Sequence, residues 1–166
     1  MRILVLIKQM LDPSGVTVRR DKERIFVNRE EYILDPGSKA ALEAALRIRE
    51  AHAGTGAGQS APSVAAMSMG EPRADDALRE ALAMGCDTAY LLSDPDFEAA
   101  DAAVTTRILA AAIEKLEGAD LVLAGREAGD SGAAQIGPGL AEALGYAGAS
   151  DVWRLDLDGT TLAAIH

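Results

Sequence analysis

The stretch from Ala119 to Gly145 constrains the fold most, because its pattern changes twice within one short segment. It opens with an apolar run, Leu121 to Ala124, which is short enough for a strand buried on both faces. Glycines then alternate with charged and hydroxyl side chains. Afterwards apolar residues recur at every fourth position from Ile136 to Leu144, which is typical of one helix face, and Gly145 is a C-terminal cap. The sequence therefore predicts a strand, a glycine-rich loop and a helix in direct succession.

This succession is a suitable place for an anion. Backbone N–H groups converge where a loop enters a helix, and the helix dipole adds partial positive charge there. Small residues let a ligand approach the main chain closely. A flexible loop without a ligand has the same pattern, so the residues alone leave both interpretations open.

The rest of the chain also alternates between strands and helices. Strands are expected at Ile3–Ile7, Val64–Met69 and Thr88–Leu92, and helices from Asp35–Pro36, from Pro72, and over Asp101–Leu116. Two apolar segments, Val16–Val18 and Ile25–Val27, flank a polar one and predict a hairpin inserted after the first strand; Asp158–Gly159 predicts a second, C-terminal hairpin. The expected fold is α/β, a three-layer sandwich with a mainly parallel, Rossmann-like sheet, and residues 1–166 form a single domain.

The helical periodicity also predicts which side chains are buried. These are Leu42, Ala45, Leu46 and either Ile48 or the Arg49 stem in the first helix, Leu78, Ala81 and Leu82 in the second, and Val104, Ile108, Ala111 or Ala112, and Leu116 in the third. Asp35 is expected to cap the first helix and to do nothing more. Gly54–Gly58 follows a helix rather than a strand, so it predicts a flexible connection and not a dinucleotide fingerprint.

Charge and cysteine content exclude several classes of partner. The formal net charge of −10 argues against nucleic acid or an anionic membrane as the main partner. The single cysteine, Cys86, excludes an internal disulfide and a cysteine-based metal site, and suits a reducing compartment. No apolar run reaches membrane-spanning length, and Met1 leads directly into a strand, so we expect a cytoplasmic chain.

The sequence offers little that makes or breaks bonds. It has no P-loop and no nucleophile elbow, and only His52 and His166 are present to assist a nucleophile. The acids at Asp75–Asp76 and Asp94–Asp96 fit a helix start and a turn better than a metal cluster. We therefore expect no catalytic residue and no metal ligand.

A ligand cleft is nevertheless expected at the carboxyl edge of the parallel sheet. Lys8 directly follows the first strand, and Asp35, Met69–Gly70 and the loop Gly125–Gln135 reach the same edge. Lys8 either meets a phosphate there or is a solvated loop residue.

Five segments in order resemble the β subunit of electron-transfer flavoprotein, including its nitrogen-fixation-associated members. They are Arg2–Lys8, Asp35-Pro36 through Arg47, Ser68-x-Gly70 with Ala81–Asp87, Asp120–Asp130, and Ala134-Gln-Ile-Gly-Pro138. Ser93-Asp94-x-x-Phe97-x-x-Ala100-Asp101 further resembles the electron-bifurcating subgroup, whose β subunit holds a second FAD where other members hold AMP. That subgroup's loop resembles Asp-Gly-Asp-Thr-Ala-Gln, whereas this one reads Asp130-Ser-Gly-Ala-Ala-Gln135, so FAD and AMP both stay open.

The resemblance implies an adenine-nucleotide-binding fold with FAD, alternatively AMP, as cofactor. It also implies a heterodimer with an α subunit that carries the electron-shuttling FAD, receiving electrons from flavin dehydrogenases. The nucleotide-binding residues that it implies are Leu6, Lys8, Asp35, Met69, Gly70, Thr105, Gly125, Arg126, Asp130, Ser131, Gly132, Ala133, Ala134, Gln135 and Ile136.

Other functions remain open on the residues alone. A stand-alone AMP- or ATP-binding sensor has the same architecture, and an adenylate-cleaving enzyme is a third candidate. Family members continue well past the C-terminal hairpin, so we expect the chain to be truncated there, as a fragment or as a naturally short relative.

Overall fold

A four-stranded parallel sheet forms the centre of the protein, whose computed structural model describes residues 1–19, 23–52, 61–158 and 161–166. Its strands are β1 (Arg2–Leu6), β6 (Ser63–Met69), β7 (Thr88–Leu92) and β8 (Leu121–Leu123), in the spatial order β7-β6-β1-β8. In the register of the sheet, Ile3 lies between Val64 of β6 and Leu121 of β8. The carboxyl ends of β1, β6 and β8 therefore meet at one edge.

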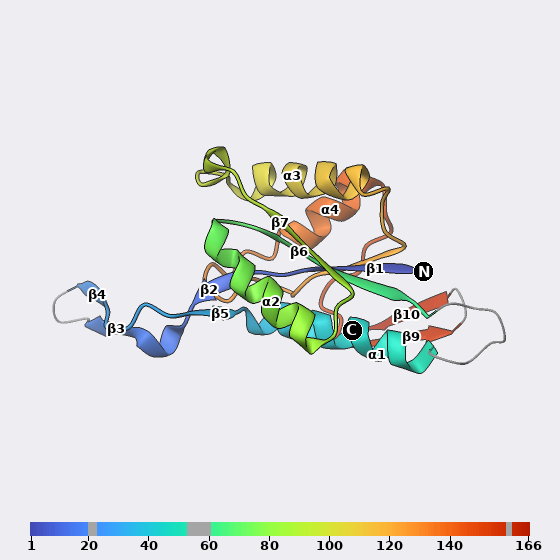
Figure 1. Ribbon diagram of the computed structural model, residues 1–166, viewed down its shortest axis with the longest axis horizontal. Coiled ribbons are helices and arrows are strands. Elements are labelled where there is room, and N and C mark those ends of the chain that lie inside the picture. The colour runs from blue at the N-terminus through green and yellow to red at the C-terminus, as the bar shows by residue number, and fades with distance from the viewer. Residues whose placement is uncertain (20–22, 53–60, 159–160) are drawn as a thin grey trace.

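Helices cover both faces of this sheet. The helices α1 (Pro36–His52) and α2 (Asp75–Met84) pack on one face, and α3 (Ala102–Lys115) and α4 (Ile136–Leu144) pack on the other, as Figure 1 shows. The three layers and the parallel strands confirm the predicted α/β sandwich.

Strand β1 is apolar from Ile3 to Leu6 because it contributes to two separate cores. Ile3 and Val5 face α1 and α2, whereas Leu4 and Leu6 face α3 and α4. Side chains of neighbouring residues point to opposite faces of a strand, so a strand covered on both sides has no polar face.

The helix faces were predicted with mixed success. The buried side of α1 is confirmed, since Leu42, Ala45, Leu46 and Ile48 are all buried. Two other expectations are wrong. Leu82 of α2 is exposed, because the buried stripe of that helix is formed by Ala77, Leu78 and Ala81, about a quarter-turn away.

The face expected for α3 was wrong in part. The helix buries Thr106, Leu109, Ala110 and Ile113 most deeply. Of the expected residues, Ala112 and Leu116 are partly buried against the same core, whereas Val104, Ile108 and Ala111 are not part of it. Apolar residues surround most of α3, so periodicity alone does not select one stripe. The packing of α4 selects it: a Cβ on Gly139 would lie 3.0 Å from the Thr106 side chain.

The remaining elements are short. They are β2 (Gln9–Leu11), β3 (Val16–Arg19), β4 (Arg24–Val27), β5 (Tyr32–Leu34), β9 (Arg154–Asp158), β10 (Thr161–Ile165) and the 3-10 turns at Pro13–Gly15, Pro72–Ala74 and Pro95–Phe97. Both predicted hairpins are confirmed, as β3–β4 and β9–β10. The antiparallel pair of β2 with β5, at the base of the first hairpin, was not predicted.

Two sequence expectations lie outside the described residues. These are the flexible connection at Gly54–Gly58 and Gly159 of the C-terminal turn. Within the described ranges, no helix is both long and apolar enough to cross a lipid bilayer.

Candidate functional site

The carboxylate of Asp35 joins the start of α1 to the loop after β8. Its Oδ2 accepts hydrogen bonds from the Ser38 backbone N–H (2.8 Å) and the Ser38 hydroxyl (3.2 Å), which caps the helix. Its Oδ1 accepts the backbone N–H of Gly129 at 2.8 Å. Asp35 is only 1% exposed. The expectation that it caps the helix and does nothing more is therefore wrong, because it also fixes the glycine-rich loop.

Two glycines let this loop lie directly against the helix. A Cβ on Gly125 would stand 2.7 Å from the carbonyl carbon of Gly37 and 3.0 Å from the backbone nitrogen of Ser38. Real Cβ atoms do not approach a main chain that closely, so this contact requires glycine at position 125. A Cβ on Gly37 would in turn lie 3.2 Å from the carbonyl oxygen of Glu127.

A tight turn follows and leads into α4. The carbonyl oxygen of Ala128 accepts the N–H groups of Ser131 (3.2 Å) and Gly132 (2.8 Å), and Gly132 has a φ of +63°. Nothing lies within 4 Å of where a Cβ on Gly132 would be, so the turn is open on that side.

The N–H groups after this turn are available to a ligand. Within the described part of the chain, the backbone N–H groups of Ala133, Ala134 and Gln135 donate to no acceptor. The side chain of Gln135, the N-cap residue of α4, makes no capping bond either. Three small or neutral residues thus present unpaired donors at a helix start, where the dipole is positive, and this arrangement can bind an anion.

Lys8 lies beside this loop and is paired within it. Its Nζ contacts Asp130 Oδ1 at 2.9 Å, while its backbone N–H donates to Ser38 Oγ at 3.0 Å and its carbonyl accepts the Asp35 N–H. Partial burial alone would raise the pKa of Asp130, but the hydrogen bond and charge of Lys8 outweigh it and lower that pKa. The ammonium group of Lys8, paired with Asp130, therefore lies at the edge of the loop.

Arg126 forms an ion pair with a different segment. Its Nε contacts Asp151 Oδ1 at 2.5 Å, and the hydrogen bond and charge of Asp151 raise the pKa of the guanidinium. Asp151 belongs to the segment before β9, so the ion pair ties the loop to the C-terminal hairpin.

The sequence-predicted residues fall into three groups. Hydrogen bonds and close contacts join Lys8, Asp35, Gly125 and the turn up to Gly132, and the N–H groups of Ala133, Ala134 and Gln135 follow directly. Leu6, Met69 and Ile136 share the apolar cluster beneath α3 and α4. Gly70 and Thr105 are not joined to the loop: the Gly70 N–H donates to the carbonyl of Leu92, and the Thr105 N–H to that of Asp101.

Sequence reasoning missed three residues that build the site. Ser38 connects Lys8 to Asp35, Gly37 receives the loop, and Asp151 holds Arg126. Only Ser38 left a usable signal, because it follows Asp35 at the N-cap-to-N3 spacing of a capping box. The other two depend on contacts between segments far apart in the sequence.

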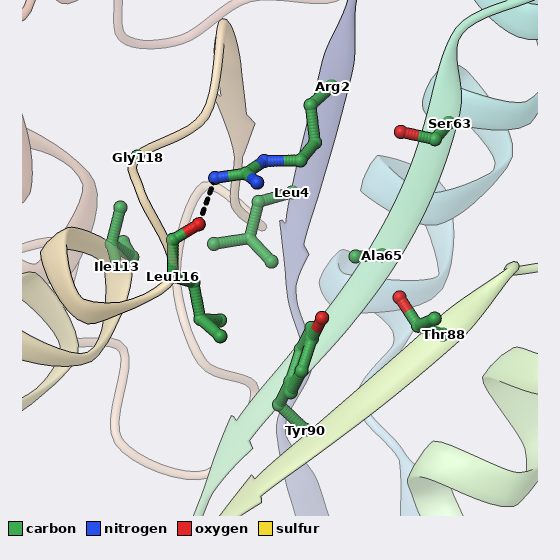
Figure 2. Close-up of a pocket in the computed structure, with 9 residues that line it drawn as sticks. All are labelled: Arg2, Leu4, Ser63, Ala65, Thr88, Tyr90, Ile113, Leu116 and Gly118. Atoms are coloured by element: carbon green, nitrogen blue, oxygen red, sulfur yellow. Dashed lines mark hydrogen bonds between the residues drawn. The ribbon is translucent and has the colours of Figure 1, made fainter.

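Two other concave places lie away from this site. A cavity of about 50 Å³ opens at the amino ends of β1, β6 and β7, and its lining includes Thr88 and Tyr90. Figure 2 shows that, at the opposite side of this cavity, Arg2 donates to the Leu116 carbonyl. This volume is far below that of a site for a nucleotide-sized ligand. A shallow apolar groove between β7 and α3 includes Phe97 and Ile108.

The chain is similar to proteins of one family. Residues 24–166 match the family described as "Electron transfer flavoprotein domain". An "Electron transfer flavoprotein subunit beta" of Thermoanaerobacterium thermosaccharolyticum is 41% identical over 162 residues, which is 98% of this chain and 59% of that relative.

Two further relatives carry more specific names. The "Caffeyl-CoA reductase-Etf complex subunit CarD" of Acetobacterium woodii is 44% identical over 144 residues, covering 87% of this chain and 52% of its own length. "Protein FixA" of Azorhizobium caulinodans is 39% identical over 149 residues, covering 87% and 50%. The chain therefore spans between half and three-fifths of the length of these three relatives.

Proposed function

The chain belongs to the electron transfer flavoprotein family, and from this premise we propose that it is the adenine-nucleotide-binding part of a β-type subunit. It binds FAD, with AMP as the alternative, and pairs with an α subunit that carries the electron-shuttling FAD. The complex takes electrons from flavin dehydrogenases. All 166 residues act as one nucleotide-binding domain in the cytoplasm, and the chain has no catalytic activity of its own.

One observation carries this proposal. The loop Gly125–Gln135 is fixed to α1 through Asp35, yet the N–H groups of Ala133, Ala134 and Gln135 are without an acceptor in the described residues. A loop held against α1 that leaves three N–H groups without a protein acceptor at a helix start can donate them to a ligand in place of water. A phosphate oxygen is such an acceptor, and both AMP and FAD supply one.

The other residues complete the site around this phosphate. Lys8 is paired with Asp130, and its ammonium serves the phosphate by exchanging that carboxylate for a phosphate oxygen. The apolar side chains of Leu6 and Met69 flank the adenine from the direction of the α3 and α4 layer. Arg126 reaches the phosphate only by exchanging its ion pair with Asp151.

A bound flavin would supply all the redox chemistry, by accepting and donating electrons. The residues of this chain position the nucleotide and set the charge around it. His52 and His166 do not take part, because one lies at the C-terminal end of α1 and the other bonds the Ser150 carbonyl. Burial raises the pKa of the Cys86 thiol to about 11, so it stays protonated and acts as part of the core.

A stand-alone AMP or ATP sensor is the second candidate function. It uses the same glycine-rich loop, fixed by the bond from Gly129 to Asp35, because AMP and ATP each carry a phosphate that such a loop can bind. A sensor holds AMP or ATP without an α subunit, whereas an electron-transfer subunit forms a complex with one.

Nucleotide binding and complex formation with an α subunit are measured separately to test the proposal. Ligand released from the purified protein is identified by mass spectrometry, and FAD, AMP and ATP are titrated calorimetrically into protein freed of ligand. The protein is then mixed with an electron-transfer-flavoprotein α subunit and examined by size-exclusion chromatography with flavin absorbance. We expect bound FAD or AMP and a stable complex that contains flavin.

The control and the contradicting results are distinct. Leu82→Gln serves as the control variant, because Leu82 is exposed on α2, away from the loop, and its replacement leaves both readouts unchanged. Nucleotide binding without any complex favours the sensor. Saturable binding of neither FAD nor AMP, in a folded protein, contradicts the nucleotide site.

A further inference from the structure

Exposed apolar side chains are concentrated on the β3–β4 hairpin, which we name the arm (Val16–Arg19 and Arg24–Val27). The described residues include eight large apolar side chains that are exposed, and four of these belong to the arm: Val18, Ile25, Phe26 and Val27. Figure 1 shows the arm projecting away from the sheet and the helices. Contiguous exposed apolar surface is uncommon on a protein that has no partner there.

One face of the arm is wholly aliphatic. In the antiparallel register, Val16 lies opposite Val27, and Val18 lies opposite Ile25. Directly opposed residues point to the same side, so these four side chains form one continuous strip. Val18 is 64% exposed and Ile25 is 70% exposed. Because an isolated two-stranded hairpin is only marginally stable in water, a covering surface would stabilise the arm.

The other face of the arm is cationic. Arg19 lies opposite Arg24, next to the pair of Thr17 and Phe26, and the Arg19 guanidinium lies 6.0 Å from the Phe26 ring centroid. Among the described residues, no carboxylate forms an ion pair with either arginine. Like charges directly opposite each other destabilise a hairpin, and carboxylates from outside the arm would relieve this repulsion.

We infer that the arm inserts into a cleft of the α subunit that has one aliphatic wall and one acidic wall. The aliphatic wall covers the strip formed by Val16, Val18, Ile25 and Val27, and the acidic wall pairs with Arg19 and Arg24. This inference rests on the proposed function, because it takes the α subunit as the partner. Apolar burial supplies the affinity, while the charges set the orientation and the salt dependence.

The arginines of the arm favour the α subunit over a second copy of the chain or a membrane as the surface that covers the arm. Two copies of the chain that pack aliphatic strip to strip would leave Arg19 and Arg24 of each copy on the outer faces, away from the contact. That contact also involves far fewer than the roughly 20–30 residues a side of a stable interface. A membrane is disfavoured because the arginines point away from the aliphatic strip, and the chain carries a net charge of −10.

Two double variants test the two walls separately. Val18→Thr with Ile25→Thr removes the aliphatic strip and keeps β-branched residues, so the hairpin propensity is retained. Arg19→Gln with Arg24→Gln removes the charge. Leu82→Gln is the control for the first pair, because Leu82 is also exposed but lies on α2.

The arginine variant of the arm, Arg19→Gln with Arg24→Gln, has its own control on α1 and α2. Arg47→Gln with Arg79→Gln removes two exposed arginines, of which the side chains are 75% and 73% exposed. Affinity of each variant for the α subunit is measured by isothermal titration calorimetry at low and high salt. Affinity for AMP is measured in parallel.

We expect each arm variant to bind the α subunit at least tenfold more weakly, with AMP affinity unchanged and both controls within twofold of the wild type. Only the arginine variant loses most of the salt dependence. Arm variants that bind the α subunit as tightly as the wild type overturn the inference and leave the proposed function standing. A wild type that binds AMP but no α subunit overturns both the partner assignment and this inference.

Two further results also overturn the inference. One is a dimer of the chain alone that Val18→Thr with Ile25→Thr dissociates, which identifies a second copy as the occupant. The other is binding to phosphatidylglycerol–phosphatidylcholine vesicles that the same variant abolishes, together with an unchanged affinity for the α subunit.

Discussion

Replacing Asp35 with asparagine removes the bond between α1 and the glycine-rich loop. The Asp35 carboxylate uses one oxygen for Ser38 and the other for the N–H of Gly129. The side-chain amide of asparagine has a single acceptor oxygen, so its NH₂ group must face a backbone N–H on one of the two sides.

The size of the effect follows from burial. Asp35 is 1% exposed, so water does not replace the lost bond. A hydrogen bond to a charged group contributes about 1.5–3 kcal/mol, and the donor left without a partner adds a desolvation penalty. We therefore expect Asp35→Asn to lower the free energy of unfolding by about 2–3 kcal/mol, and the melting temperature by roughly 5–10 °C.

Urea denaturation monitored by circular dichroism measures this change, and Asp101→Asn is its matched control. Asp101 also caps a helix, accepting the Val104 N–H at 2.8 Å, but it is exposed and its side chain bonds no other segment of the described chain. Asparagine is nearly as good an N-cap as aspartate, so we expect the control to change stability by less than about 0.5 kcal/mol. AMP affinity, measured by calorimetry, falls only in the Asp35 variant.

Equal stability of the two variants would refute this reasoning. It would mean that the Gly129–Asp35 bond contributes nothing and that the loop does not depend on α1. If Asp35→Asn lowered stability but left AMP affinity unchanged, the Gly129–Asp35 bond would stabilise the fold without contributing to nucleotide binding.

Three further changes test other parts of the account. Gly132→Val places a β-branched residue at φ +63°, which strains the turn by about 1–3 kcal/mol. We expect it to abolish nucleotide retention, measured by mass spectrometry of released ligand, and to leave the fold intact. Asp130→Asn removes a stabilising ion pair with Lys8. Because folding lowers the pKa of Asp130, the variant is less stable than the wild type above the ordinary pKa of 3.8, and this difference is lost as the pH falls below that value; urea titrations at several pH values measure it. Ile113→Ala, at 1% exposure, lowers the free energy of unfolding by about 2–5 kcal/mol, and the half-buried Ile108→Ala by clearly less.

Each of these has a contradicting result. Normal nucleotide retention in the Gly132 variant shows that the loop is not the phosphate site. A stability difference for Asp130→Asn that persists unchanged well below pH 3.8 removes the ion pair as its cause. A larger loss for Ile108→Ala than for Ile113→Ala restores the helix face that the sequence predicted.

Local sequence patterns predicted most elements of the fold. The strand at Thr88–Leu92 and the capped helix after Asp35 follow from local signals, namely a short apolar run and an Asp-Pro pair. The buried face of α3 did not follow, because the choice among its apolar stripes depends on the contact of Gly139 with Thr106. That contact joins two segments far apart in the sequence.

The same distinction holds at the candidate site. The glycine-rich loop and its helix start were predicted from residues that are neighbours in sequence. The bond from Asp35 to Gly129 and the close contact of Gly125 with Gly37 were not, since each joins segments about 90 residues apart. A local pattern predicts where a loop begins, but not which distant main chain it lies against.

The central claim is that main-chain N–H groups after the loop bind the phosphate of an adenine nucleotide. Amide chemical shifts, recorded in ¹H–¹⁵N spectra during a titration with AMP, test it most directly. The account predicts that the amides of Ala133, Ala134 and Gln135 shift most, with the same saturation as the calorimetric binding curve. Saturable AMP binding that leaves these three amides unmoved, and shifts amides elsewhere, would contradict it.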